Sequence, residues 1–349
     1  MNPFPNFYGN HSAAGTLARL IESDRVAQTI LLSGPEGVGK ATLARRFAGA
    51  LLGGVAKIEA DDLSLPENVS VIEERDKWTA DKRAGDPLLF ASHPDFITFA
   101  PEGPLRQITI QQMRALRQRA QFKPLRGNYR VFLIDHLHRA NEQAANSLLK
   151  VLEEPPEHLV LIATAENLYD LLPTIRSRAL VLQLFRLPDA EMTAFAQDRG
   201  LPDWETRVAL AQGSPGLAAR LNLEQFRGRR QLLLTAFECG AGLRPFAAWV
   251  QESESFSANR SEKLDLYLRP AYDLLRDLLA LTNGRPALQN RDLDERLSTL
   301  AKGLSFAWLE AAAKALDELV QMARRNIQKT AALDAMIIKL RNEPNSART

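Results

Sequence analysis

The chain has 349 residues, of which 45% are hydrophobic and 25% charged, as is ordinary for a soluble protein of two or three domains. Because 44 Lys and Arg face 42 Asp and Glu, any contact with nucleic acid must come from a local basic patch. The single cysteine, Cys239, excludes a disulfide framework and a thiolate zinc site, and indicates a cytoplasmic location. We expect no signal peptide and no membrane span.

A glycine-rich turn near the N-terminus follows a short apolar run. The segment 29–42 reads TILLSGPEGVGKAT, and apolar residues at helical spacing resume directly after it. This is the strand–loop–helix context of a P-loop. Gly34, Gly37 and Gly39 let backbone N–H groups approach a polyphosphate at a helix N-terminus, and Lys40 can reach its outer phosphates. A glycine turn without a ligand is the alternative.

The P-loop pattern lacks one ligand for Mg²⁺. The residue after the lysine, which normally supplies a hydroxyl to the metal, is Ala41. Thr42 lies one place later, about 100° around the helix, and cannot substitute without distortion. The sequence therefore predicts a phosphate site with an incomplete metal site.

Residues 53–94 are polar and acidic, and we expect them to form a surface insertion with a short helix around Asp76–Gly85. Strands alternate with helices on both sides of it, which predicts an α/β domain with a five-stranded parallel sheet and its ligand at the carboxyl ends of the strands. The expected strands are the run before the P-loop and residues 95–99, 130–135, 159–164 and 179–184.

The strand 130–135 ends in Asp135, the position of a carboxylate that holds Mg²⁺ in P-loop ATPases. Such ATPases normally carry a glutamate next, which orients the attacking water. Here that residue is His136, which we interpret as a solvent-facing polar residue at a strand end.

The second half of the chain has a helical pattern. We expect an all-α lid of three short helices in residues 187–224 and an all-α collar domain in residues 225–349, following an α/β domain in residues 1–186. Pro270 should kink or delimit the long helix expected at 264–281.

Several segments resemble the AAA+ subunits of bacterial sliding-clamp loaders. They are SGPEGVGK, VFLID, LIAT at 161–164, LLPTIRSR at 171–178 and, above all, AANSLLKVLEEPP at 144–156. The two acids before the prolines oppose the helix dipole, so local stability does not explain them. In the family this element packs at a subunit interface. The resemblance covers roughly the first 220 residues.

Within this family the chain is most similar to subunits that do not hydrolyse ATP. Ala41, His136 and Gly216 stand where hydrolysing subunits carry the hydroxyl residue, the glutamate and a sensor arginine. The resemblance implies a component of the DNA polymerase III holoenzyme without ATPase activity of its own. It leaves open whether ATP or ADP binds without hydrolysis at Gly34, Gly37, Gly39, Lys40, Thr42, Asp135 and Thr164.

The pair Ser177–Arg178 matches the family's serine–arginine element. The resemblance implies that Arg178 is an arginine finger, which acts in trans at the ATP site of a neighbouring gamma/tau subunit. The alternative is a solvated or carboxylate-paired arginine. The implied partners are the gamma/tau and delta subunits, with the sliding clamp and primed DNA reached through the assembled complex, and no membrane.

Related subunits often carry a cysteine-rich zinc module in the insertion. Residues 53–94 contain no cysteine and only one histidine, His93, so we predict no zinc there and assign no metal ligands. The segment from Arg106 to Arg130 holds seven basic residues and no acidic one. Helices in this position line the DNA path in the family, so Arg114, Arg117 and Lys123 are candidates for DNA phosphate contacts. An acidic neighbouring subunit is the competing partner.

Two other functions fit parts of the sequence. The first is a working gamma/tau-like ATPase in which Thr42 serves the metal. The second is a P-loop kinase of small substrates.

Overall fold

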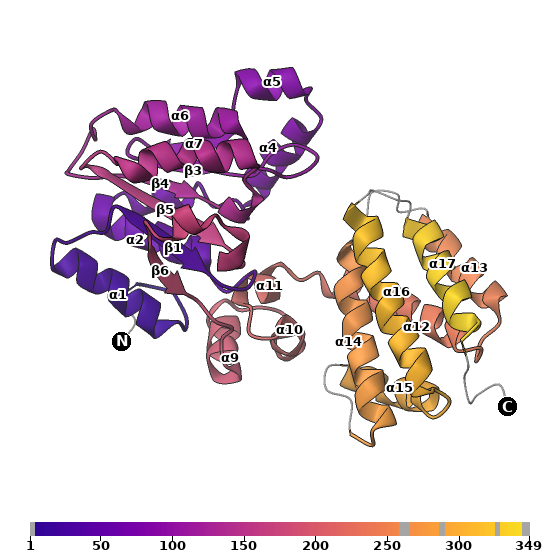
Figure 1. Cartoon of the computed structure of the whole chain (residues 1–349). Helices are drawn as coiled ribbons and strands as arrows, with labels where there is room; N and C mark the ends of the chain where they lie inside the picture. Colours follow the sequence, from indigo (N-terminus) through magenta and orange to yellow (C-terminus); the bar gives the residue numbers. More distant parts are fainter. Residues whose placement is uncertain (1–3, 258–264, 286–289, 325–328, 344–349) are drawn as a thin grey trace. The chain divides into compact units, whose positions relative to one another are not determined.

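The computed structural model describes residues 4–257, 265–285, 290–324 and 329–343 (Figure 1). The chain divides into two compact units, residues 1–220 and 221–349. The first unit contains a sheet, its covering helices and the three short helices predicted after the sheet. The described residues of the second unit form helices joined by turns and loops, with no strand among them.

The sheet has six strands in the order β2-β3-β4-β5-β1-β6. Five of them run parallel, which confirms the predicted parallel α/β sheet, and β2 pairs antiparallel with β3 at one edge. The carboxyl ends of the parallel strands consequently meet at one edge of the sheet. The strands are β1 Thr29–Ser33, β2 Leu89–His93, β3 Phe96–Phe99, β4 Arg130–Ile134, β5 Leu159–Ala165 and β6 Leu180–Gln183.

The sixth strand, β2, lies within the region expected to be a surface insertion. Its register is irregular between Phe90 and His93, and Ala91 and Ser92 are exposed, so the segment has no clear alternation of apolar and polar residues. Three helices precede it, instead of the single helix expected around Asp76–Gly85. They are α3 Val55–Glu59, α4 Pro66–Asp76 and α5 Ala80–Gly85.

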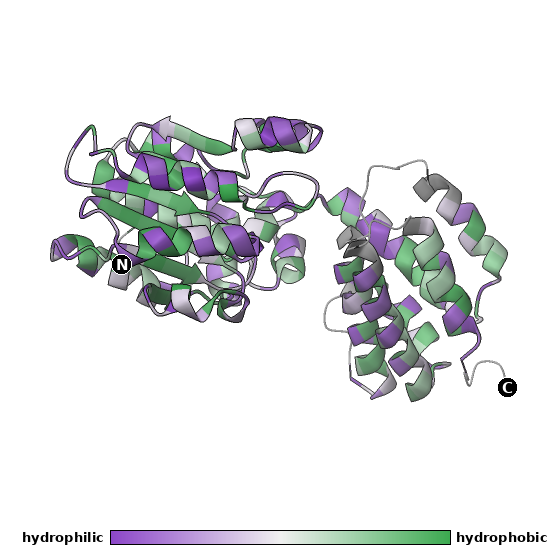
Figure 2. Cartoon of the chain, turned by 45° about the horizontal axis from the view of Figure 1, so that its top comes forward, coloured by the Kyte–Doolittle hydropathy of each residue, from purple (hydrophilic) through white to green (hydrophobic). Residues whose placement is uncertain are grey.

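Helices cover both faces of the sheet (Figure 1). Successive strand residues point to opposite faces: Leu31 packs with α6 and α7, whereas Ile30 and Leu32 pack with α1 and α2. Figure 2 shows the strands as hydrophobic between helices of mixed hydropathy. The covering helices are α1 His11–Glu22, α2 Lys40–Leu52, α6 Ile110–Ala120 and α7 Glu142–Glu153.

Short helices follow β5 and β6. They are α8 Pro173–Arg176, α9 Asp189–Asp198, α10 Trp204–Ala211 and α11 Pro215–Arg220. The last three share a small apolar core around Met192, Phe195 and Ala218, against which Tyr8 from the N-terminal segment packs. This core holds α11 beside the P-loop.

The second unit is a helical bundle around the buried side chains of Phe237, Trp249 and Trp308. Cys239 is fully buried here, and burial raises the pKa of its thiol. Pro270 lies inside α14, which does not end there. The helices are α12 Leu223–Gly240, α13 Phe246–Ser257, α14 Asp265–Thr282, α15 Asp294–Ala301, α16 Phe306–Arg324 and α17 Lys329–Arg341. Among the described residues of either unit, no helix has the length and apolar character needed to span a membrane.

Candidate nucleotide site and interface arginine

The P-loop occupies the turn between β1 and α2. Its three glycines have positive φ angles, 150° at Gly34, 76° at Gly37 and 97° at Gly39, in the region that favours glycine. A Cβ atom at Gly34 would lie only 2.1 Å from the carbonyl oxygen of Leu184. The glycines are therefore demanded by the backbone path, and a bound phosphate is not needed to explain them.

Lys40, the first residue of α2, is turned inward. Its Nζ donates hydrogen bonds to the carbonyl oxygens of Gly34 at 2.6 Å and Pro35 at 2.7 Å. Burial lowers the pKa of this amine, although the carboxylates of Glu166 and Asp135 oppose the shift. To meet a phosphate, the ammonium group has to leave the carbonyls of its own loop.

Asp135 follows β4 at the carboxyl edge of the sheet. Its carboxylate accepts a hydrogen bond from the hydroxyl of Thr164 on β5, and that hydroxyl accepts one from the backbone N–H of His136 at 2.8 Å. The structure thus joins the predicted site residues Asp135 and Thr164 in one network. Thr42 does not belong to this network but lines the same cavity.

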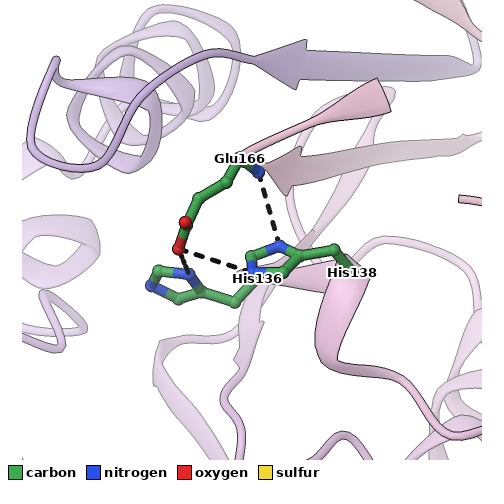
Figure 3. Close-up of side chains that lie close together, drawn as sticks. All are labelled: His136, His138 and Glu166. Atoms are coloured by element: carbon green, nitrogen blue, oxygen red, sulfur yellow. Dashed lines mark hydrogen bonds and ion pairs between the residues drawn. The ribbon is translucent and has the colours of Figure 1, made fainter. Parts of the chain in front are cut away.

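His136 and His138 surround the carboxylate of Glu166, which follows β5 (Figure 3). Oε1 of Glu166 lies 3.9 Å from Nδ1 of His136 and 3.4 Å from Nε2 of His138, and the backbone N–H of Glu166 donates to Nδ1 of His138 at 3.4 Å. The hydrogen bond from His138 is the largest cause that lowers the pKa of Glu166, to about 2. Glu166 is therefore a carboxylate throughout the physiological range of pH.

His136 follows β4 as a polar residue, as expected, but it is half-buried and only partly faces solvent. Its backbone has φ 57°, in the left-handed region, and its side chain is only 30% exposed. Its Nδ1 is buried and has no hydrogen-bond partner among the described residues. The sequence gives no sign of Glu166, because this residue lies 30 positions along the chain, in the loop after another strand.

The helix α11 docks directly on the P-loop. The backbone N–H of Gly216 donates to the carbonyl oxygen of Gly37 at 2.9 Å, and the hydroxyl of Ser214 donates to that of Glu36 at 2.9 Å. A Cβ atom at Gly216 would lie 3.1 Å from the same Gly37 oxygen. A side chain at this position would therefore require α11 or the P-loop to give way by a few tenths of an ångström.

The P-loop, the end of β4 and the docked helices enclose a cavity of about 520 Å³. This volume lies in the range of small-molecule sites. Phe7 and Tyr8 from the N-terminal segment line the cavity too, and the sequence did not point to either. The Tyr8 hydroxyl is fixed by a 2.7 Å hydrogen bond to Asp198 of α9.

Arg178 precedes β6, which runs parallel to β1 with Ile30 beside Leu180 and Ser33 beside Gln183. The arginine therefore lies at the amino edge of the sheet, whereas the P-loop begins at the carboxyl edge. Because a strand rises about 3.3 Å per residue, the length of β6 alone separates the two edges by about 10 Å. Arg178 does not line the cavity.

The side chain of Arg178 makes two contacts. Its Nη1 donates to the carbonyl oxygen of Thr174 at 3.1 Å, and its Nη2 pairs with Glu153, the last residue of α7, at 3.3 Å. The side chains of Arg178 and Glu153 are 37% and 54% exposed, so this is a surface ion pair, worth about 0–1 kcal/mol. Breaking this ion pair costs little free energy, so Arg178 is available to bind another anionic group.

The basic segment includes residues with structural partners as well as exposed residues that form no ion pair with the described part of the chain. Arg106 pairs with Asp76 of the insertion at 3.1 Å, and Arg130 is buried, so these two have structural partners. Arg114, Arg117 and Lys123 are exposed, on α6 and the loop after it, and form no ion pair with any described residue. The predicted DNA contacts thus lie on an accessible surface.

These features define a P-loop α/β protein whose following helices dock on the P-loop. The sequence model of the family described as DNA polymerase III, delta subunit, matches residues 9–188, slightly more than half of the chain. The chain belongs to this family, and the sequence resemblance to clamp-loader subunits is confirmed.

The chain is similar to several curated proteins. It is 34% identical to DNA polymerase III subunit delta' of Pseudomonas aeruginosa over 213 residues, which are 58% of each chain. It is 30% identical to DNA polymerase III subunit gamma/tau of Mycobacterium tuberculosis over 201 residues, 55% of this chain and 30% of that protein. The chain thus spans less than two thirds of either relative. A solved gamma subunit-related protein of Thermotoga maritima is 18% identical, with a TM-score of 0.48 over 94% of this chain and 98% of that one.

Proposed function

We propose that this chain is a delta-prime-like clamp-loader subunit that does not hydrolyse ATP and supplies Arg178 to the ATP site of a neighbouring gamma/tau subunit. Its partners are the gamma/tau and delta subunits, and the assembled complex places the sliding clamp on primed DNA. The observation that carries the proposal is the position of Arg178, at the sheet edge opposite to its own P-loop.

The chain's own site lacks what hydrolysis requires. Ala41 offers no hydroxyl to Mg²⁺, and His136 replaces the glutamate that would orient the attacking water. Lys40 is engaged by the carbonyls of the P-loop. The carboxylate of Asp135 remains, and the cavity is large enough for a nucleotide, so binding of ATP or ADP without turnover is compatible with the site.

The purified chain is expected to release no phosphate from ATP in the presence of Mg²⁺ above the background of a Lys40→Ala variant. The physical reason is the absence of both the metal-binding hydroxyl and the glutamate. Phosphate release, measured with and without primed DNA, checks this. Turnover by the native chain that Lys40→Ala abolishes would instead support the gamma/tau-like ATPase.

Charge reversal of Arg114 and Arg117 is expected to weaken DNA binding by the assembled loader. Each phosphate contact that is lost should lower the slope of log K against log salt by about 0.9. Fluorescence anisotropy with labelled primed DNA at several salt concentrations measures both quantities. Lys150→Glu, at an exposed position of the neighbouring helix α7, is the matched control. An unchanged affinity and slope in the double variant would favour a protein partner for this surface.

A further inference from the structure

We propose that His136, His138 and Glu166 form a binding site for a transition-metal dication of the zinc type. The three side chains come from the segment after β4 and the loop after β5, and converge on one point (Figure 3). The site lies outside residues 53–94, where we expected no zinc module. The proposal depends on these three residues alone and not on the role of Arg178.

The distances between the ligand atoms suit a metal ion. One ligand atom from each residue lies within 4.8 Å of the other two, and Oε1 of Glu166 is 3.4 Å from Nε2 of His138 and 3.9 Å from Nδ1 of His136. In a tetrahedral zinc site with bonds of about 2.0–2.1 Å, neighbouring ligand atoms are separated by roughly 3.3–3.4 Å. Small side-chain rotations would therefore bring all three atoms to bonding distance.

The ligand set selects the kind of metal. Imidazole nitrogens favour Zn²⁺, Cu²⁺ or Ni²⁺, whereas Mg²⁺ and Ca²⁺ prefer oxygen ligands. Two histidines and one carboxylate provide three ligands, which is the number that leaves a fourth position open for water or substrate. His136 and Glu166 both line the cavity beside the P-loop, so this open position would face the cavity.

A second observation concerns Nδ1 of His136. This atom is buried without a hydrogen-bond partner among the described residues, although buried polar atoms in folded proteins normally have one. On the opposite side of the ring, Nε2 lies 3.8 Å from the carboxylate of Asp135. A metal-binding histidine typically directs its second nitrogen at a carboxylate, which fixes its tautomer and orientation. A metal ion at Nδ1 would satisfy the orphaned atom.

His138 has to change its tautomer when it binds a metal. Its Nδ1 now accepts the backbone N–H of Glu166, so the ring proton resides on Nε2 and points at the carboxylate. Coordination through Nε2 moves this proton to Nδ1 and gives up the N–H contact, which is long at 3.4 Å. In the metal-bound state the dication lies between Nε2 of His138 and the carboxylate of Glu166, where the ring proton lies in its absence.

The test uses the full chain after treatment with a chelator. Titration with Co²⁺, followed by visible absorption, and with Zn²⁺, followed by calorimetry, is expected to show one tight equivalent. Two variants remove ligands, His136→Asn and Glu166→Gln. Asparagine is chosen at position 136 because it tolerates the left-handed backbone there. Each is expected to weaken binding by about 100-fold or more, since even residues that only orient ligands contribute 10–100-fold.

His11→Asn is the matched control, because it removes an exposed histidine on α1 that does not line the cavity. Circular dichroism shows whether the metal-free variants fold. If a ligand variant does not fold, His138→Asn is used in its place. The proposal is overturned if the native chain binds no equivalent of Co²⁺ or Zn²⁺. It is equally overturned if the folded ligand variants bind the metal as tightly as the native chain does.

Discussion

Replacing Arg178 by alanine is expected to slow ATP hydrolysis at the neighbouring gamma/tau site by about 10³-fold or more. An arginine finger stabilises charge on the transferring phosphoryl group, and its removal typically costs 10³–10⁵ in rate. Single-turnover hydrolysis by the reconstituted loader, with clamp and primed DNA present, measures this step.

The control for this experiment is Arg176→Ala. Arg176 lies two residues earlier and stacks over the ring of Tyr169 at 5.3 Å within the same subunit. It should affect the rate little. Arg178→Lys should remain slow, because an ammonium group cannot form the paired hydrogen bonds of a guanidinium. A full rate in Arg178→Ala, or the same loss in Arg176→Ala, would rule out the role in trans.

The second large effect concerns the stability of the first unit. Arg75 of α4 pairs with Glu102 at 3.1 Å, and their side chains are only 7% and 1% exposed. Arg75→Met leaves the Glu102 carboxylate buried without its partner, which typically costs 3–5 kcal/mol. Urea unfolding followed by tryptophan fluorescence should show this loss as a lower midpoint for the first unit.

The decrease in the free energy of unfolding caused by Arg75→Met should be smaller at acidic pH. Burial raises the pKa of Glu102, and the hydrogen bond and charge of Arg75 oppose that shift. Without Arg75 the pKa in the folded state rises further, so the folded variant binds a proton that the unfolded chain releases. The free energy of unfolding of the variant therefore increases as the pH falls through the raised pKa of the folded state towards the ordinary pKa of a glutamate.

Lys82→Met is the control, because Arg75 and Lys82 both lie over the ring of Trp78, at 4.4 Å and 3.7 Å from its centroid, but Lys82 is exposed. Lys82→Met should leave the free energy of unfolding nearly unchanged. A loss in Arg75→Met that is small, or that does not vary with pH, would mean that Glu102 finds another partner or reaches water.

The parts of the fold that follow local patterns could be predicted from the sequence. The buried strands, the P-loop turn and the capping box of α6 at Thr109 and Gln112 all depend on neighbouring residues. The antiparallel strand β2 could not, because its pairing with β3 is determined by tertiary contact, and Ala91 and Ser92 carry no apolar signal.

The predicted and observed sites differ for a similar reason. The segment 106–130 contains no acidic residue, yet Arg106 is paired, because Asp76 comes from the insertion. His136 appeared free because neither its left-handed backbone nor the distant Glu166 can be read from the residues around it. Contacts between separate loops decide both cases.

The hydrogen bonds between α11 and the P-loop have an energetic consequence. An ATP-driven motor performs work when occupancy of its nucleotide site changes the angle between the sheet and the helices that follow. Here the N–H of Gly216 and the hydroxyl of Ser214 bind main-chain oxygens of the loop itself, so closure needs no ligand. In the proposed complex we therefore expect the first unit to keep the same shape whether or not the neighbouring subunits hydrolyse ATP.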